Sequence, residues 1–301
     1  MRPSARKRIR HPARTLAAAL TALCLSNSFA RATGEERGHY LFDLAGCLAC
    51  HTDSKNGGQP LAGGRALITP FGTYYSPNIT ADREHGIGAW SAADFVTALR
   101  HGRRRDGRAY FPVFPYTAYS GLSERDMLDI RAYILSLPAA PRPNRDHDTG
   151  MIFGNRLLAA AWQALFFAPK PINPDNRGAY LVEALGHCAE CHTPRGWLGN
   201  LDEDRHLAGT TEGPEGHLVP NITPDQETGI GKWRADDLHN LFTMGLLPDG
   251  DFADGGMAEV ITNTTGKWRK GDLAAVIDYL KSLPAVRNRV AKEKSAATGE
   301  W

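Results

Sequence analysis

Two short motifs contain the residues of this sequence that are best suited to chemistry. The sequence reads Cys-Leu-Ala-Cys-His at residues 47–51 and Cys-Ala-Glu-Cys-His at residues 188–192. Two thiols on one helical turn can form thioether bonds to the vinyl groups of a porphyrin, and the adjacent imidazole can then bind the iron. The motifs therefore predict two covalently bound haem c groups, held by Cys47, Cys50, His51, Cys188, Cys191 and His192, with the two histidines as proximal iron ligands.

Other uses of these cysteines explain the sequence less well. The chain has five cysteines; apart from Cys24, which lies in the leader described below, all are in the two motifs. A zinc site of four cysteines leaves both histidines without a role. A redox-active dithiol is expected beside a βαβ unit, which the sequence lacks. Haem attachment is the only one of these interpretations that uses every cysteine and histidine of the motifs.

A c-type haem usually takes a sixth ligand from its opposite face, and methionine is a common one. In the second half of the sequence, Met257 lies in Gly-Gly-Met-Ala at residues 255–258, which we expect to be a flexible loop. Met244 is the rival, but it falls in a helical stretch that ends at Gly245 and is expected in the core. We therefore predict Met257 as the sixth ligand of the second haem.

The first half has no methionine at the matching position. The halves align over this region with Gly102 against Gly245, 143 residues apart, and the same alignment places Phe114 against Met257. A phenyl ring cannot bind iron, Met127 falls on a predicted closing helix, and Met151 lies beyond the predicted domain. The first haem is therefore predicted to have an open or water-bound sixth site, or a ligand from among His39, His85, His101 and Tyr110.

Repeated blocks around the motifs indicate the elements that position them. Gly-x-Tyr-Leu precedes each motif, Pro-Asn-Ile-Thr follows it at residues 77–80 and 220–223, and Ser-Leu-Pro closes each half. Apolar residues at helical spacing predict a helix leading into each motif, a middle helix after Ser91 or from near Ala235, and a closing helix ended by proline. No alternating pattern is long enough to build a sheet. We predict an all-α fold of two tandem class I cytochrome c domains, at residues 33–138 and 177–301.

Residues 139–176 form the predicted linker between these domains. Proline punctuates both of its ends, and the stretch Leu157–Ala168 is apolar apart from Gln163. Twelve residues are too few to cross a bilayer as a helix. We predict a short apolar helix packed across both domains; the alternative is a surface for a membrane or a partner subunit, with Trp162, Phe166 and Phe167 as anchors.

The first 32 residues have the pattern of a secretory signal peptide. Arginines and a lysine begin the segment, an apolar run follows over residues 16–25, and small residues at Ala30 and Ala32 could allow cleavage. Without this segment the chain has 28 basic and 33 acidic residues, so its charge does not favour nucleic acid as a partner. We expect the protein in the periplasm, with peripheral association at the outer face of the inner membrane as an option.

Over nearly its whole exported length the chain resembles the cytochrome c subunits of bacterial membrane-associated alcohol, gluconate and sorbitol dehydrogenases. The motifs, the Pro-Asn-Ile-Thr blocks with Gly-Ile-Gly-x-Trp, and the Ser-Leu-Pro endings carry this resemblance. The family pattern has Pro-x-Met-Pro-Tyr where this chain has Phe114, which agrees with the missing ligand. Many relatives also have three haems and a C-terminal anchor, whereas this sequence has two motifs and no apolar tail before Trp301.

The resemblance implies a subunit that transfers electrons and does no substrate chemistry. Its partners would be a dehydrogenase catalytic subunit and a downstream acceptor, which could be quinone, another cytochrome or an oxidase. Two other functions follow from an open first haem: an enzyme acting on peroxide or a sulfur compound, or a sensor of small gases. We expect the electron-transfer function.

Overall fold

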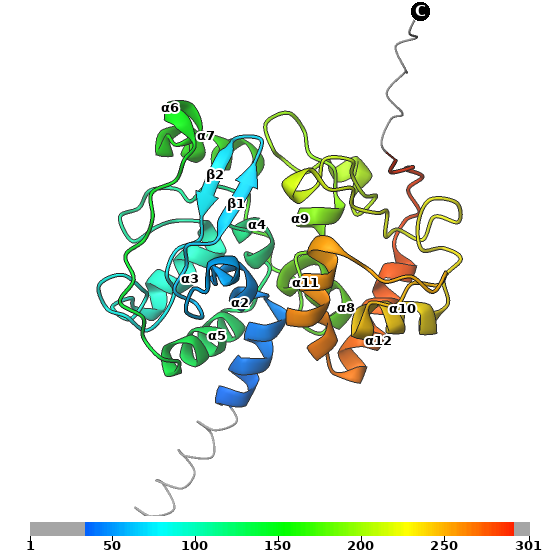
Figure 1. Ribbon diagram of the computed structural model, residues 1–301, viewed down its shortest axis with the longest axis horizontal. Helices are drawn as coiled ribbons and strands as arrows, with labels where there is room; N and C mark the ends of the chain where they lie inside the picture. The colour runs from blue at the N-terminus through cyan, green and yellow to red at the C-terminus, as the bar shows by residue number, and fades with distance from the viewer. Residues whose placement is uncertain (1–33, 292–301) are drawn as a thin grey trace, which may run out of the picture.

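The computed structural model describes residues 34–291, so the predicted signal peptide lies outside the described residues. Helices joined by long loops make up most of the structure, and the two halves of the chain lie side by side (Figure 1). The first half contains a helix over residues 34–44, then α2 (Cys47–Cys50), α3 (Ala92–His101), α4 (Tyr116–Tyr119) and α5 (Glu124–Ser136).

The second half repeats this order. Its first helix is α8 (Arg177–Ala179), which continues as a π-helical segment (Tyr180–Leu185), followed by α9 (Ala189–His192), α10 (Ala235–Met244), α11 (Gly255–Asn263) and α12 (Lys270–Ser282). The predicted middle and closing helices are thus confirmed. The Ser91 hydroxyl accepts a hydrogen bond from the Asp94 backbone N–H, and the Asp94 carboxylate accepts one from the Ser91 N–H, so a capping box fixes the start of α3.

The described chain is largely helical, but the expectation that no sheet forms is wrong in one place, because the first half contains a small antiparallel hairpin. Strands β1 (Ala66–Thr69) and β2 (Gly72–Tyr75) pair with Ala66 opposite Tyr75 and Thr69 opposite Gly72. The turn between them depends on Gly72, whose φ of 117° strongly favours glycine. Each strand has only four residues, too few to give a recognisable alternating pattern.

Glycine explains the repeated block that precedes each motif. A Cβ atom at Gly38 would lie 2.2 Å from the Asp129 carbonyl oxygen of α5, and one at Gly178 would lie 2.2 Å from the Ala275 carbonyl oxygen of α12. In each half the entry helix therefore crosses the closing helix in direct backbone contact, which any larger residue would prevent. This crossing fixes where each haem motif begins.

A reciprocal hydrogen-bond network joins the two halves. The Tyr40 hydroxyl donates to Asp272 Oδ2 at 2.6 Å, and the Tyr180 hydroxyl donates to Asp126 Oδ2 at 2.5 Å. Each aspartate also pairs with an arginine of its own half, Asp126 with Arg37 and Asp272 with Arg177. One continuous apolar cluster contains buried residues of both halves, and a smaller separate cluster lies around Tyr74 and Phe111. The halves therefore meet across a pseudo-symmetric, buried interface.

In the sequence, α6 (Gly150–Phe153) and α7 (Arg156–Phe166) lie between the two halves. Helix α7 contacts both halves, because the Gln163 side chain donates to the Gly102 carbonyl at 2.8 Å and the Trp162 indole donates to the Leu198 carbonyl at 2.9 Å. Within residues 34–291 no helix combines the length and apolar character needed to cross a bilayer.

Candidate functional site

The two motif histidines are oriented in the same way. His51 Nδ1 lies 2.7 Å from the Pro77 carbonyl oxygen, and His192 Nδ1 lies 2.8 Å from the Pro220 carbonyl oxygen. A carbonyl only accepts, so Nδ1 carries the proton and the lone pair is on Nε2, the atom left to bind a metal. Burial lowers the pKa of both imidazoles, although the hydrogen bond to the carbonyl opposes this shift. Both rings are therefore held neutral, as metal ligation requires.

In both halves, a glycine turn packs between the motif histidine and the loop that contains the proline carbonyl. The Gly63 N–H donates to the His51 carbonyl at 2.8 Å, and the Gly209 N–H donates to the His192 carbonyl at 2.6 Å. A Cβ atom at Gly63 would come within 2.4 Å of the Pro77 backbone, and one at Gly209 within 2.5 Å of the Asn221 backbone. The motif, the glycine turn and the proline carbonyl are thus packed backbone against backbone in both halves.

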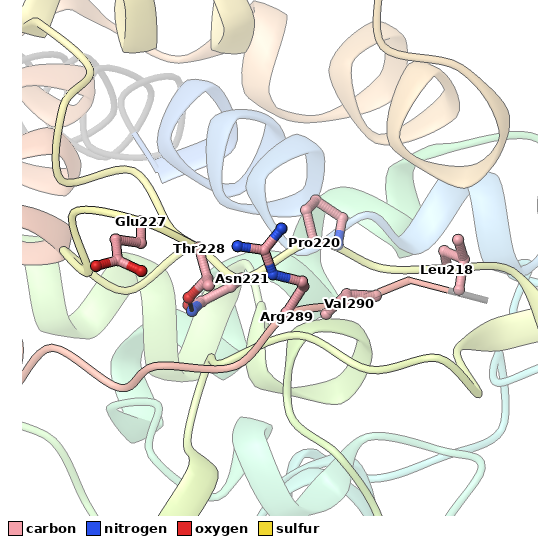
Figure 2. Close-up of a pocket in the computed structure, with 7 residues that line it drawn as sticks. All are labelled: Leu218, Pro220, Asn221, Glu227, Thr228, Arg289 and Val290. Atoms are coloured by element: carbon pink, nitrogen blue, oxygen red, sulfur yellow. Dashed lines mark hydrogen bonds between the residues drawn. The ribbon is translucent and has the colours of Figure 1, made fainter. Parts of the chain in front are cut away.

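Hydrogen bonds within each Pro-Asn-Ile-Thr block stabilise the loop that contains the proline carbonyl. The Asn78 side-chain oxygen accepts hydrogen bonds from the N–H and hydroxyl of Thr80, and Asn221 does the same for Thr223. The asparagine amides then donate to the segment after each closing helix, at the Ala140 and Val286 carbonyls. Figure 2 shows a surface hollow beside Pro220 and Asn221 of the second block. None of the predicted site residues lines this hollow.

The four motif cysteines are available for haem attachment. None is in a disulfide, and no group of three or more metal-binding side chains comes together within the described part of the chain, residues 34–291. Within residues 34–291 the four thiols therefore do not lie together as one group. Burial raises the pKa of Cys47 and Cys188 to about 12 and that of Cys50 and Cys191 to about 11. Each copy of the motif thus has the free thiols and free Nε2 atom that haem c attachment requires.

The two predicted candidates for the sixth ligand of the second haem lie in different surroundings. Met257 is partly buried against the core, but it lies in the first turn of α11 and not in a loop as predicted. Gly255, with a φ of 53°, is the first residue of this helix. Met244 is 57% exposed at the end of α10, so the expectation that it fills the core is wrong. Met257 remains the better candidate, because it is partly buried against the core whereas Met244 is exposed.

Phe114 lies in an aromatic cluster of the first half. Its ring lies 5.2 Å from that of Tyr110 and 5.9 Å from that of Tyr119, measured between centroids. Of the four substitutes considered for the missing ligand, Tyr110 is the one beside Phe114. His39 and His101 are exposed, and His39 stacks on Tyr133, while the His85 backbone N–H donates to Asp82 on a loop. Of the four candidates, Tyr110 is therefore the one whose ring packs on Phe114.

The sixth-ligand region of each half contacts the motif of the other half. Arg65 donates to the Ala49 carbonyl inside the first motif at 2.8 Å and pairs with Glu259, two residues after Met257. In the reverse direction, Thr117, three residues after Phe114, donates to Glu190 inside the second motif at 2.7 Å. These contacts bring the two attachment motifs to the same interface.

Sequence reasoning missed His187, which lies at the centre of this interface. Its ring packs perpendicular to the Tyr119 ring at 5.5 Å, and the Tyr119 hydroxyl donates to the Ala45 carbonyl at 2.7 Å. His187 immediately precedes Cys188, and Ala45 lies two residues before Cys47. Desolvation lowers the pKa of His187, which favours its neutral form. Its position directly before the second motif is the only signal that the sequence offers.

Comparison with known proteins shows that the chain is similar to cytochromes c. The cytochrome c family model matches residues 35–138. Over 269 residues the chain is 41% identical to a protein of Cereibacter sphaeroides named diheme cytochrome c-type. The matched region covers 86% of this chain and 89% of that protein.

Two further relatives are subunits of dehydrogenases. The chain is 36% identical to the cytochrome c subunit of the quinone alcohol dehydrogenase of Gluconobacter oxydans, across 90% of this chain and 60% of that protein. It is 39% identical to the fructose dehydrogenase cytochrome subunit of Gluconobacter japonicus, across 83% of this chain and 52% of that protein. This chain therefore spans little more than half the length of these two subunits. With its attachment geometry present and a full-length diheme relative, the chain belongs to the cytochrome c family.

Proposed function

We propose that this protein is a periplasmic diheme cytochrome c that transfers electrons from a dehydrogenase catalytic subunit to a respiratory acceptor. Residues 33–138 and 177–301 would each act as a cytochrome c domain, and residues 139–176 would link them. The dehydrogenase partner is supported by the relatives that are cytochrome subunits of alcohol and fructose dehydrogenases.

The observation that carries this proposal is that Tyr119 links the residues that lie directly beside the two attachment motifs. The ring of His187, beside Cys188, packs on Tyr119, whose hydroxyl is bonded to Ala45 beside the first motif. Arg65 and Thr117 add hydrogen bonds that reach each motif from a residue outside it. An electron carrier needs its cofactors held close together in a rigid, water-poor setting, and these contacts supply that setting.

The residues of the chain have clear roles in this function. The cysteines would hold the cofactor covalently, and the Nε2 atoms of His51 and His192 would bind iron from one side while their Nδ1 atoms stay bonded to proline carbonyls. Met257 would bind the second iron from the other side. Haem supplies a reversible one-electron exchange at its iron; the protein sets how readily this occurs through the axial ligands and burial.

The experiment is reduction of the haem-loaded protein by a purified membrane-bound dehydrogenase and its substrate. We expect rapid reduction of both haems, followed by reoxidation on adding a soluble cytochrome or a quinone. Matched assays without the dehydrogenase should show no substrate-dependent reduction. Failure of every tested dehydrogenase to reduce the protein, together with turnover of a substrate by the isolated protein, would contradict the proposal.

A second function rests on Phe114. Without a methionine at this position, the first haem could bind a small molecule, as an enzyme or a gas sensor would need. Carbon monoxide added to the reduced protein tests this directly. Rapid binding at one haem, lost in Phe114→Met, would support a ligand-binding role, whereas no binding would leave electron transfer alone.

A further inference from the structure

The helices that lead into the two motifs differ by one residue. Tyr40 and Tyr180 are 140 positions apart in the sequence, whereas Cys47 and Cys188 are 141 apart, so the second half has one extra residue before its motif. This residue is accommodated by the π-helical segment Tyr180–Leu185, while the first half stays α-helical over residues 34–44. Single-turn π-helical segments of this kind occur frequently at functional sites.

The residue directly before the second motif has a backbone conformation that favours glycine. His187 has a φ of 38°, and the aligned residue of the first half is Gly46, with a φ of 64°. Both lie in the left-handed region, where glycine meets no steric clash but a residue with a Cβ atom does. Such strain persists only where surrounding contacts enforce it, and it is concentrated at functional sites. The contacts of His187 therefore indicate what its side chain does.

The ring of His187 packs on Tyr119, the last residue of α4. The two ring centroids are 5.5 Å apart and the rings are nearly perpendicular, at 84°. A Cβ atom at Gly121 would lie 3.1 Å from the Ala184 side chain, so the turn after α4 also packs on the π-helical segment. Figure 1 shows α4 at the boundary between the two halves. The π-helical segment and His187 thus both pack against the end of α4.

The pair of rings connects the two attachment motifs. On one side, His187 is joined to Cys188 by a single peptide bond. On the other side, the Tyr119 hydroxyl donates to the Ala45 carbonyl at 2.7 Å, and Ala45 lies two residues before Cys47. Burial raises the pKa of the Tyr119 hydroxyl well above its ordinary value, and the nearby thiols of the first motif add to this shift. Packed or bonded atoms therefore lead from one motif to the other.

The two halves also touch at the pseudo-symmetric position, beside the first motif. A Cβ atom at Gly46 would lie 3.4 Å from Thr264 Oγ1, so Thr264 approaches the first motif as Tyr119 approaches the second. Neither glycine nor threonine has a ring. The interface thus has two corresponding contacts, of which the one at His187 is built from two aromatic rings.

This difference matters for electron transfer. An electron passes between separate cofactors fastest through bonded and closely packed atoms, and much more slowly across a gap. A void beside a side chain offers no atoms on its empty side. The ring of His187 fills the space between the second motif and Tyr119, where a glycine would leave a gap. The strained backbone is therefore the condition for placing a ring at this position.

We propose that the His187–Tyr119 ring pair is the junction through which an electron passes between the two haems, with His187 as the positioning residue. This inference rests on the proposed electron-transfer function. One electron crosses the junction, so one iron is oxidised as the other is reduced. The two rings keep their own oxidation state, and no bond is formed or broken.

The test is proton NMR of the haem methyl groups in the partly reduced, haem-loaded protein. It measures how fast an electron exchanges between the two haems of one molecule, and dilution separates this from exchange between molecules. His187→Gly introduces the residue of the first half, which suits the backbone. We expect it to slow the exchange within one molecule several-fold, with the haem content and the unfolding temperature not lowered. His187→Phe keeps a ring and should retain most of the rate.

The matched control is Thr264→Ala, which shortens a side chain at the pseudo-symmetric contact and should exchange electrons like the unchanged protein. The proposal is overturned if the unchanged protein shows no exchange within one molecule, or if His187→Gly exchanges as fast as it does. It is also overturned if His187→Phe is as slow as His187→Gly, if Thr264→Ala slows the exchange equally, or if His187→Gly loses rate and stability together.

This measurement is separate from the test of the proposed function. The protein is partly reduced with dithionite, and no dehydrogenase is present. Failure of every dehydrogenase to reduce the protein would contradict the proposed function and leave the exchange rate between the haems unchanged. A fast exchange in His187→Gly would overturn the junction alone.

Discussion

The two halves of the molecule share one scaffold but differ at the position opposite the motif histidine. In both, a histidine is bonded to a proline carbonyl, an asparagine braces that loop, and a tyrosine reaches across to an aspartate of the other half. At the aligned sixth-ligand position, one half has Met257 and the other has Phe114. The elements that surround each Cys-x-x-Cys-His motif are thus duplicated, whereas the residue predicted as the sixth ligand is not.

A second difference lies on the outer surface. Only the first half has the β1–β2 hairpin among the described residues; at the comparable place the second half has a single bridge between Thr210 and Val219. The hairpin turn packs on α6 through the Phe71 and Phe153 rings. The halves are therefore specialised both at the cofactor and at the surface.

The largest expected effect comes from removing one attachment motif at a time. Cys188→Ala with Cys191→Ala should remove the haem of the second half and leave about half of the haem absorbance per chain. Cys47→Ala with Cys50→Ala should do the same for the first half. Mass spectrometry of the haem-loaded chain measures the number of bound groups, and an unchanged mass in either variant would contradict two-site attachment.

The next effect concerns the sixth ligands. Met257→Ala should lower the reduction potential of one haem by a sizeable part of the roughly 0.8 V that axial ligation spans, and it should remove the methionine–iron absorption feature. Phe114→Met should raise the potential of the other haem and add that feature a second time. Redox titration with optical spectra measures both. Two identical methionine-ligated haems in the unchanged protein would show that the halves do not differ.

The interface between the halves provides a test of stability. Tyr180→Phe leaves the buried Asp126 carboxylate and the Ser123 N–H without their hydroxyl partner, so we expect the free energy of unfolding to fall by about 2 kcal/mol. Tyr40→Phe makes the same change at a half-buried site and should cost about 1 kcal/mol. Denaturant titration measures both. Tyr75→Phe is the control, because no hydrogen bond to the Tyr75 hydroxyl exists among residues 34–291. An equal loss of unfolding free energy in this variant would contradict the role of the two interface hydroxyls.

The smallest effect is a pH dependence at Asp272. Burial raises the pKa of this carboxyl, but hydrogen bonds from Arg177 and Tyr40 outweigh burial and lower it. A lowered folded pKa stabilises the fold above the unfolded pKa of about 3.9, and this stabilisation is lost as the pH falls further. The difference in unfolding free energy between the unchanged protein and Asp272→Asn should therefore shrink between about pH 6 and pH 3. Asp278→Asn, an exposed position on the same helix, controls for the aspartate-to-asparagine substitution itself.

The two attachment motifs could be recognised from the sequence, because the chemistry they predict is local. Two thiols and an imidazole within five residues define attachment whatever the surrounding fold. The caps and apolar spacing of α3, α5, α10 and α12 also lie within each helix, so their positions were predicted. The β1–β2 hairpin was missed because its strands are too short to show a period.

The sequence by itself determined the two Cys-x-x-Cys-His motifs, the duplicated blocks around them and the asymmetry between Phe114 and Met257. Only the tertiary structure decided how the halves meet: that Tyr40 and Tyr180 reach the aspartates of the opposite half, that His187 lies between the motifs, and that α7 turns its apolar face outward. These depend on contacts between residues far apart in the chain. No local pattern encodes which partner a side chain finds, because packing of the whole molecule selects it.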